Sequence, residues 1–538
     1  MDSTTDTSFA GLKIVLETNH VTAATSTAVL GILFHITVVR YLDVDNFMYT
    51  FLALLWAASA LVTSAHLLIG FSFISACARV LLLAISFDAG LFLSMAVYRV
   101  FFHRLRKFPG PFGAKVSRFY SAYLAGKDVK YYKEVEKMHR KYGDFIRTEI
   151  TTTTNGGARR GTEDSQSKVW ANLSCERETM NMLTWNPALN TYEPRIKRRV
   201  DGFVSQVSNI KTLDATAWSM YLSFDIMGEV GFGKDFGGIA SGTEHPAIKG
   251  IHSHMEILGI MSHVPWFLNL ISRVPGAAAS YAGFFSWCAA EIKAKQKQWD
   301  PEQYPQDIVS WLLKAYVEKD TSASPTEEAL HEDSRVVIIA GSETTATTLT
   351  SILYFLAKHP AVYRKLQSHV DAAIPTPIDW TYEKVKSITY IDDIINETLR
   401  LKPALMTGGY RVTPPQGLQI DEQYIPGDTN VFVPVQLIQT DDRYWKRAAE
   451  FVPERFGEKR IEMETDGAPF IPFALGAYQC PGKNLAMISM RIVLSRIAQQ
   501  FDVSFAPGET GEVFDKEALD TFTTALPPVM MEFSERKK

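Results

Sequence analysis

The sequence predicts a large, mainly helical domain with small β-sheets, preceded by a membrane region of about three transmembrane helices. Three long apolar runs lie in the N-terminal fifth of the 538 residues, and the remainder mixes apolar and charged residues at helical spacing. Short β-branched runs separated by glycine and proline lie between Lys402 and Thr440. We therefore divide the chain into a tail (1–20), a membrane region (21–102), a basic, proline-rich linker (103–126) and a large domain (127–538).

The membrane region consists of the runs Val21–Val38, Met48–Phe73 and Val80–Phe102. A helix needs about 20 apolar residues to cross a bilayer, so the second and third runs are long enough and the first needs its flanks. The basic segment His103–Lys107 follows the third run and favours the cytoplasmic side. With this orientation, residues 1–20 lie in the lumen as a tail. A cleaved signal peptide is not the favoured interpretation, because the early segment lacks a basic start and other membrane-length segments follow.

Local patterns predict further elements. The sequence Phe-Pro-Gly-Pro at Phe108–Pro111 indicates a stiff, non-helical hinge. Helices are predicted over Tyr131–Lys141, Asp307–Glu318 and Lys483–Gln500, and a strand over Asp144–Ile150.

Two other regions are defined by apolar residues. Gln419–Tyr424 and Val431–Val435, with Pro426-Gly427 between them, suit strands of a small sheet. Ile257–Val274 is apolar around Pro265-Trp266-Phe267. Ordinary core packing is the favoured interpretation of that segment, and a membrane-facing lid over a channel is the alternative.

Cys480 lies in the loop Phe473-Ala-Leu-Gly-Ala-Tyr-Gln-Cys-Pro-Gly482, directly before a predicted helix. Gly476 and Gly482 allow backbone conformations and close approaches that a side chain would obstruct. Amides at the start of the helix can point toward a thiolate and stabilise its charge. The loop therefore predicts a cysteine that binds haem iron through sulfur, against the alternative of a buried structural cysteine.

A second motif, Ala340-Gly-Ser-Glu-Thr-Thr345, lies in a run from Val336 that is apolar or small enough for a long buried helix. Gly341 lowers helix propensity, and Glu343 and Thr344 bring polar groups into an apolar setting. This combination indicates a functional role. The alternative is a helix whose hydroxyl groups bond back to its own carbonyl groups.

Glu397 and Arg400 are three residues apart, on one face of a helix predicted over Ile391–Leu401. Arg455, within Phe451–Phe456, supplies a second guanidinium. We expect the three side chains to form one bidentate network that fixes geometry and takes no part in chemistry.

Taken together, these motifs in this order resemble the cytochrome P450 family of haem-thiolate monooxygenases, over roughly Tyr131 to Phe533. The resemblance implies the cytochrome P450 fold, with 127–538 as the catalytic domain and haem b bound through the Cys480 thiolate. It also implies insertion of one oxygen atom of O2 into a lipophilic small molecule, with electrons from NADPH-cytochrome P450 reductase. With three spans, the chain resembles multi-span enzymes of fungal secondary metabolism, held in the endoplasmic reticulum membrane with the catalytic domain in the cytosol.

The resemblance also implies roles for single residues. Glu343 and Thr344 would deliver protons to dioxygen, and Arg411 would pair with a haem propionate unless it is an exposed strand arginine. Tyr478 stands where the family usually has arginine or histidine, and it can donate one hydrogen bond. The implied cofactor-binding residues are Cys480, Phe473, Gly476, Gly482, Arg411 and Tyr478, with Cys480 as the metal ligand and Glu397, Arg400 and Arg455 as structural supports.

The segment Thr151–Pro187 departs from the family, which usually carries a Trp-x-x-x-Arg helix there. The polar, glycine-containing run is typical of loop or disorder, and neither Trp170 nor Trp185 has an arginine four residues later. Resemblance resumes at Leu189–Arg195. The hypothesis is that Thr151–Pro187 is a variant or mispredicted stretch and that the chain holds haem less firmly.

Net charge and cysteine spacing bear on other classes of function. A net charge of −4 gives no electrostatic support for nucleic-acid binding. The cysteines Cys77, Cys175, Cys288 and Cys480 have no disulfide or zinc spacing, which is consistent with a reducing cytosolic face. Two other functions stay open: a haem-thiolate isomerase or dehydratase that needs no external electrons, and a non-catalytic membrane haem protein.

Overall fold

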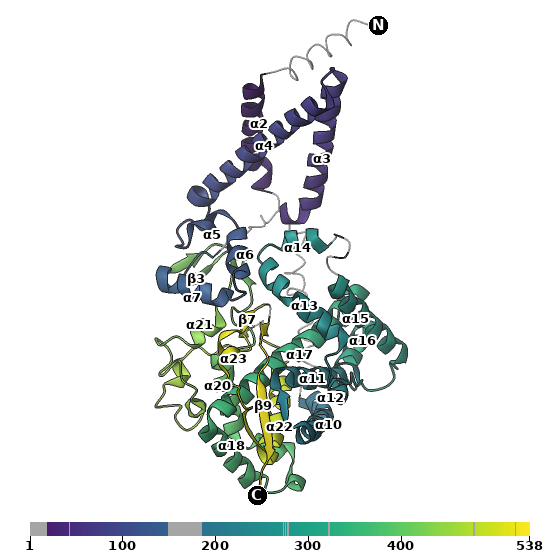
Figure 1. The fold of residues 1–538 in the computed structure, drawn as a ribbon, viewed down its shortest axis with the longest axis vertical. Helices are drawn as coiled ribbons and strands as arrows, with labels where there is room; N and C mark the ends of the chain where they lie inside the picture. Colours follow the sequence, from purple (N-terminus) through teal and green to yellow (C-terminus); the bar gives the residue numbers. More distant parts are fainter. Residues whose placement is uncertain are drawn as a thin grey trace.

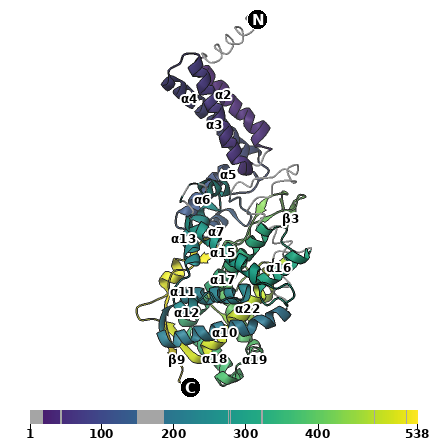
Figure 2. The ribbon, with the colours of Figure 1, turned by 90° about the vertical axis from the view of Figure 1, so that its right-hand side faces the viewer.

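The computed structural model describes residues 19–41, 44–148, 186–272, 274, 276, 279–320, 323–476, 479–521 and 523–537. It is elongated, because a bundle of apolar helices projects from one end of a large domain (Figure 1, Figure 2). Within these described residues, the domain is mainly helical with four small sheets. The predicted fold class is confirmed.

Three apolar helices form the projecting bundle. They are α2 (His20–Phe34) continued by η1 (His35–Val39), α3 (Val44–Leu68), and α4 (Phe73–Val97) continued by η2 (Tyr98–Phe102). Each is long and apolar enough to cross a membrane. The predicted bounds were wrong at the turn between α3 and α4, where Gly70 has φ +96° and Ser72 Oγ accepts a hydrogen bond from Ser75 N at 3.3 Å. This turn lies inside apolar sequence, so hydropathy alone did not show it.

Glycines bring α2 and α4 into backbone contact. A Cβ added at Gly31 would lie 2.2 Å from Phe87 O, and one at Gly90 would lie 2.0 Å from Ala28 O. Small residues allow helices to approach closely in a membrane. The α2–α4 pair is therefore the closely packed part of the bundle, and α4 crosses α2 on its way to the domain (Figure 1).

The domain contains many helices, named here in chain order. The first half has α5 (Phe112–Val116), α6 (Phe119–Gly126), α7 (Tyr131–Tyr142), α10 (Asn186–Ile210), α11 (Ala215–Met227), η3 (Gly228–Phe232), α12 (Gly238–Ser241), α13 (Pro246–Met261), α14 (Pro265–Ser272), α15 (Ala279–Gln298) and α16 (Ile308–Glu318). The second half has α17 (Glu327–Lys358), α18 (Pro360–Ala373), η4 (Pro377–Asp379), α19 (Tyr382–Lys386), α20 (Thr389–Leu401), α21 (Val435–Gln439), η5 (Pro453–Phe456), η6 (Thr465–Gly467), α22 (Lys483–Gln500) and α23 (Glu512–Lys516). The helices predicted near α7, α16 and α22 are confirmed.

Helix α17 lies at the centre of the domain. It contacts α11, α15, α20 and α22 (Figure 1). It is long and apolar enough to cross a membrane, but 72% of its most apolar stretch is buried inside the domain. It is therefore a core helix, as the run from Val336 predicted.

The sheets are small and antiparallel. A three-stranded sheet has the order β1 (Thr212–Asp214), β9 (Met530–Glu535), β6 (Phe501–Phe505), and three pairs join β2 (Arg411–Val412) to β5 (Asn430–Val431), β3 (Leu418–Ile420) to β4 (Gln423–Ile425), and β7 (Leu519–Asp520) to β8 (Thr524–Ala525). Small strands between Lys402 and Thr440 were predicted. The run Val431–Val435 is a strand only at its first residue, and α21 begins at its last residue.

The strand predicted over Asp144–Ile150 is not present in the part described, residues 144–148. Arg147 N donates to Pro109 O at 2.7 Å, and Ser121 Oγ donates to Thr148 O at 2.7 Å. These backbone groups bond to the linker and to α6 instead of a neighbouring strand. Residues 108–111 of the linker are non-helical, as predicted.

The segment Ile257–Val274 is divided between α13 and α14. Val264 is 1% exposed, whereas Ile257 is 46% and Val274 56% exposed. The rings of Trp266 and Phe267 lie within about 6 Å of Phe119, and α14 contacts the membrane helix α3. The burial of Val264 agrees with core packing for that part of the segment, and the membrane-facing lid over a channel stays a prediction.

Candidate active site

The Cys480 loop is closed by its own backbone. Cys480 N donates to Phe473 O at 2.8 Å, and Gln479 N donates to Gly476 O at 3.2 Å. Gly476 has φ +67°, a left-handed conformation that favours glycine. The loop thus places Cys480 two residues before Gly482, the N-cap of α22.

The sulfur of Cys480 lies at the N-terminus of α22. Its side chain is exposed, and the amides of Gly482 and Lys483 donate hydrogen bonds to it. Burial of the surrounding site raises the pKa of the Cys480 thiol, while these two amides and the Lys483 ammonium act in the opposite direction. The geometry therefore gives the Cys480 sulfur two amide donors that favour the thiolate.

Gly482 differs in part from its expected role. Its φ is −79°, and an added Cβ would lie 3.8 Å from Cys480 Sγ, an ordinary van der Waals distance. The backbone conformation and the approach of sulfur therefore do not by themselves require glycine at this position.

The α17 motif has one open face and one buried face. Ala340 is exposed and Thr344 is half-buried, one turn apart on a mostly buried helix, and Thr344 Oγ1 donates to Ala340 O at 2.6 Å. The hydroxyl therefore bonds back to its own helix, which was the structural alternative for this motif, while its lone pairs can still accept a hydrogen bond. A Cβ at Gly341 would lie 2.4 Å from Met227 Sδ, so this glycine lets α11 approach α17.

Glu343 points to the buried side. It is 3% exposed, and its Oε2 accepts a hydrogen bond from Thr523 Oγ1 at 2.6 Å. Burial raises the pKa of Glu343, although the Thr523 hydroxyl and His252 oppose that rise. The carboxyl can therefore bind a proton closer to neutral pH than an exposed glutamate does.

Glu397, Arg400 and Arg455 form one network, and all three are 0% exposed. Arg400 donates to both carboxylate oxygens of Glu397 at 2.8 and 2.9 Å, and Arg455 Nε donates to Glu397 Oε1 at 3.0 Å. Each guanidinium also donates to backbone carbonyls, such as Gln439 O for Arg400 and Lys446 O for Arg455. This network joins α20 to η5 and to the chain that leads toward the cysteine loop.

The structure describes Arg411, but it does not describe Tyr478 or most of the atypical segment. Arg411 is half-buried at the start of β2, and its guanidinium donates to Tyr410 O at 2.8 Å. Tyr478 is outside the described residues, as are residues 151–185 of the atypical segment. The chain resumes with α10 at Asn186, which contains Leu189–Arg195.

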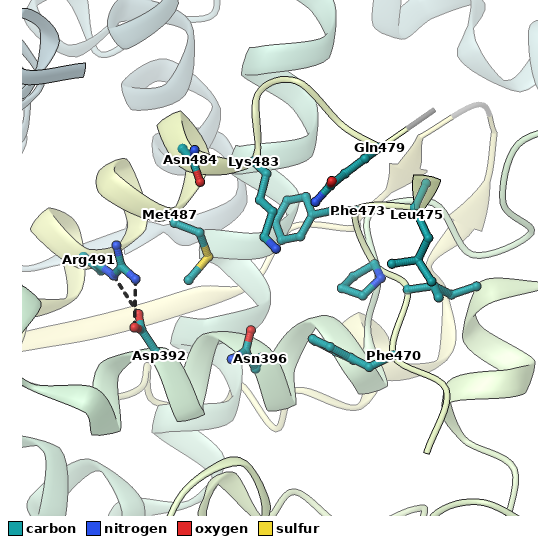
Figure 3. Close-up of a pocket in the computed structure, with 13 residues that line it drawn as sticks. Asp392, Asn396, Phe470, Phe473, Leu475, Gln479, Lys483, Asn484, Met487 and Arg491 are labelled. Carbon is teal, nitrogen blue, oxygen red and sulfur yellow. Dashed lines mark hydrogen bonds and ion pairs between the residues drawn. The ribbon is translucent and has the colours of Figure 1, made fainter. Parts of the chain in front are cut away.

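A cavity of about 340 Å³ lies between α20, α22 and the loop before Cys480 (Figure 3). Phe473, Gln479 and Lys483 line one side, and the Lys483 ammonium lies 5.8 Å from the Phe473 ring centre. On the other side Arg491 donates to Asp392 at 2.7 and 2.8 Å. Arg491 is therefore paired within the domain.

Sequence reasoning missed several residues around these motifs. Gln439 is fully buried, donates to Leu399 O at 3.0 Å and accepts from Ile471 N at 2.8 Å, so it ties α20 to the loop before Cys480. Thr523 and His252 approach Glu343 from far along the chain. No local pattern marks these residues, because each acts through a tertiary contact.

The donor set fits a haem-iron site. Among the described residues, no three His, Cys, Asp or Glu side chains come together to hold a metal ion. Cys480 supplies a single sulfur that accepts hydrogen bonds from two amides, which suits an iron whose other ligands come from a macrocycle. The open face of α17 at Ala340 and Thr344 provides a second uncovered surface in the domain.

Asp520 joins three segments that are far apart in the chain. It is 8% exposed, accepts a hydrogen bond from Tyr132 N at 2.9 Å, and also bonds to the Thr407 hydroxyl. Burial raises the pKa of Asp520 to about 6, although both donors lower it. The carboxyl therefore ties β7 to α7 and to the segment after α20.

Asp520→Asn is expected to remove a pH-dependent loss of stability. The native pKa of about 6 exceeds the ordinary 3.8, so this group's contribution is complete below about pH 4 and is lost as pH rises through 6. The loss corresponds to about 3 kcal/mol. Thermal unfolding in detergent between pH 4 and 7 should show a smaller decline for the variant, and parallel curves for the two proteins would contradict the prediction.

Comparisons with known proteins identify the family. The cytochrome P450 family model matches residues 97–533. The chain is 31% identical to cytochrome P450 monooxygenase FCK2 of Fusarium pseudograminearum, across 94% of this chain and 97% of that protein. It is 33% identical to cytochrome P450 monooxygenase orf5 of Eupenicillium brefeldianum, across 83% and 94%, and 44% identical to cytochrome P450 monooxygenase eupD of a Phoma species, across 52% and 100%.

Solved structures show the same fold. The crystal structure of the cytochrome P450DA haem domain has a TM-score of 0.56 at 20% identity, covering 67% of this chain and 76% of that one. The crystal structure of the cytochrome P450 CYP102L1 has a TM-score of 0.57 at 24% identity, covering 70% and 80%. The chain therefore belongs to the cytochrome P450 family and is an enzyme of its monooxygenase class.

Proposed function

We propose that this protein is a membrane-bound haem-thiolate monooxygenase that inserts one oxygen atom of O2 into a lipophilic small molecule of fungal secondary metabolism. Electrons come from an NADPH-dependent cytochrome P450 reductase. The observation that carries the proposal is the exposed Cys480 sulfur, which receives hydrogen bonds from the first amides of α22. When bound, haem b supplies the activation of dioxygen, and a thiolate ligand favours cleavage of the O–O bond.

The residues of the chain have distinct parts in this proposal. Cys480 holds the iron, and the two amide donors limit the basicity of its sulfur. Phe473, Gly476 and Gly482 shape the loop around it, and Arg411 and Tyr478 are the candidates for the haem propionates. Glu343 and Thr344 hold and deliver protons, while the buried network of Glu397, Arg400 and Arg455 keeps the core behind the loop in place.

The membrane placement is also part of the proposal. The Arg40 guanidinium lies 4.9 Å from the Tyr98 ring, so the ends of α2 and α4 with their basic residues meet where the domain begins. Basic residues favour the cytosolic side. The protein is then a multi-pass endoplasmic reticulum protein with residues 1–20 in the lumen and the catalytic domain (127–538) in the cytosol.

A reduced, carbon-monoxide-bound difference spectrum of the full-length chain in membranes tests the proposal. A band at the position of thiolate-ligated haem supports Cys480 as ligand, and the absence of any such band contradicts the proposal. Product formation without NADPH would instead indicate an isomerase or dehydratase. Haem content after salt washing tests the separate hypothesis for Thr151–Pro187, because near-stoichiometric retention would contradict weak haem binding.

Thr344→Ala is expected to raise the fraction of consumed NADPH that appears as hydrogen peroxide several-fold. The substitution removes a hydroxyl from the open face of α17, where it can accept and pass a proton. Thr350→Ala is the matched control, because Thr350 bonds back to Ala346 O at 2.9 Å in the same way but is 1% exposed. Equal peroxide fractions in wild type and Thr344→Ala would remove Thr344 from proton delivery.

A further inference from the structure

One carboxylate oxygen of Glu343 lies buried without a hydrogen bond. Oε2 is occupied by the Thr523 hydroxyl at 2.6 Å, whereas Oε1 has no hydrogen-bond partner among the described residues. Leaving a buried carboxylate oxygen unpaired is costly, so a group close to Oε1 is expected to interact with it.

The imidazole of His252, on α13, is a candidate for this group. His252 Nε2 lies 3.9 Å from Glu343 Oε1. The other ring nitrogen, Nδ1, lies 2.5 Å from Glu244 Oε1 in the segment before α13. The imidazole therefore stands between two carboxylates from different elements, close enough to Glu343 for a small side-chain movement or one bridging water to complete the connection.

Two of the three side chains are open to solvent and the third is buried. The side chains of Glu244 and His252 are 30% and 38% exposed, whereas that of Glu343 is 4% exposed. A proton from solvent can therefore reach the buried carboxylate through the imidazole of His252, which the hydrogen bond to Glu244 holds in place.

We propose that Glu244 and His252 form a relay that returns a proton to Glu343 after Glu343 has delivered one. The N–H bond at His252 Nε2 breaks as the O–H bond at Glu343 Oε1 forms, leaving a neutral imidazole. Nδ1 keeps its hydrogen in the bond to Glu244, so Nε2 takes the next proton from solvent, which reaches the 38% exposed side chain, and no oxidation state changes. The relay rests on the proposed role of Glu343 and makes His252 a positioning residue that acts through it.

The electrostatic surroundings suit this relay. Burial lowers the pKa of His252, but the hydrogen bond to Glu244 and the charges of Glu343 and Glu244 outweigh it and raise that pKa above 6.5. Tyr221 of α11 faces Glu244, whose charge contributes to raising the tyrosine pKa. His252 is thus charged at and below its raised pKa, and the relay is lost as pH rises through that value.

The first test measures His252 without using catalysis. Hydrogen–deuterium exchange of histidine ring protons, read by mass spectrometry across pH, gives the pKa of each histidine in the full-length protein. Glu244→Gln and Glu343→Gln should each lower the His252 pKa, by roughly 1 pH unit for the closer Glu244. The exposed His369 of α18 is the internal reference and should not change. An unchanged His252 pKa in both variants would overturn the proposal.

The second test measures proton delivery. With reductase, NADPH and no added substrate, the peroxide fraction in wild type should rise as pH passes through the His252 pKa. His252→Gln keeps size and hydrogen bonding but cannot titrate, so its peroxide fraction should be high and independent of pH. His369→Gln should follow wild type. A His252→Gln profile identical to wild type would refute the relay.

Failure of the relay and failure of the proposed function are distinguishable. A wild-type chain without a thiolate-haem band contradicts the proposed function, whatever the His252 pKa. A normal band together with wild-type pH behaviour in His252→Gln contradicts the relay alone.

Discussion

Cys480→Ser is expected to abolish the thiolate-haem band and NADPH-dependent oxidation together. A serine hydroxyl is not ionised near neutral pH and gives iron no sulfur ligand, so the electron donation that favours O–O cleavage is lost. The amides of Gly482 and Lys483 remain in place, so the loop itself has little reason to unfold. The carbon-monoxide difference spectrum and the bound-haem content measure the change.

Cys77→Ser is the matched control for that substitution. Cys77 is a free, partly buried thiol on α4, in the membrane bundle. Its replacement should leave the spectrum unchanged. If Cys480→Ser retained the wild-type band, another group would have to be the axial ligand and the proposed function would fail.

Glu397→Gln is expected to destabilise the domain more than any other single substitution considered in this protein. The carboxylate accepts hydrogen bonds from Arg400, Arg455 and Val452 N, the last at 2.9 Å. The side chains of Glu397, Arg400 and Arg455 are all 0% exposed. Neutralising it leaves two buried guanidinium groups without their counter-charge. Breaking a buried ion pair in this way costs about 3–5 kcal/mol.

The unfolding midpoint in detergent and the yield of folded protein measure this effect. Glu450→Gln is the matched control, because the Arg447–Glu450 pair is also three residues apart but both side chains are about half exposed. Exposed pairs contribute little to stability. Equal midpoints for the two variants would show that the buried network does not support the core as proposed.

Much of the architecture could be predicted because the relevant signals are local. Apolar length predicted the three membrane helices, helical periodicity predicted α7, α16 and α22, and glycine and proline turns predicted strands in the region that holds β2 to β5. The prediction failed where backbone partners decide the outcome. Residues 144–148 have strand-like composition, but their carbonyl and amide groups bond to the linker and α6.

The residues of the candidate site could also be predicted only in part. Cys480 was identifiable because its loop combines a thiol, glycines and a following helix within ten residues, and Glu397 with Arg400 because a spacing of three puts them on one helix face. Nothing near Glu343 in the sequence indicates His252 or Thr523. Those partners come from α13 and from the turn between β7 and β8.

The sequence by itself therefore determined the apolar helices that are long enough to span a membrane and the helical fold class, and it predicted the cysteine of the candidate site. Periodicity, hydropathy and turn chemistry act between residues close in the chain. Only the tertiary structure decided which groups face one another. It placed Gln439 between α20 and the cysteine loop, closed the network on Glu397, and left one oxygen of Glu343 directed at His252. Contacts across long chain separations depend on the packing of whole elements, so short sequence patterns do not contain them.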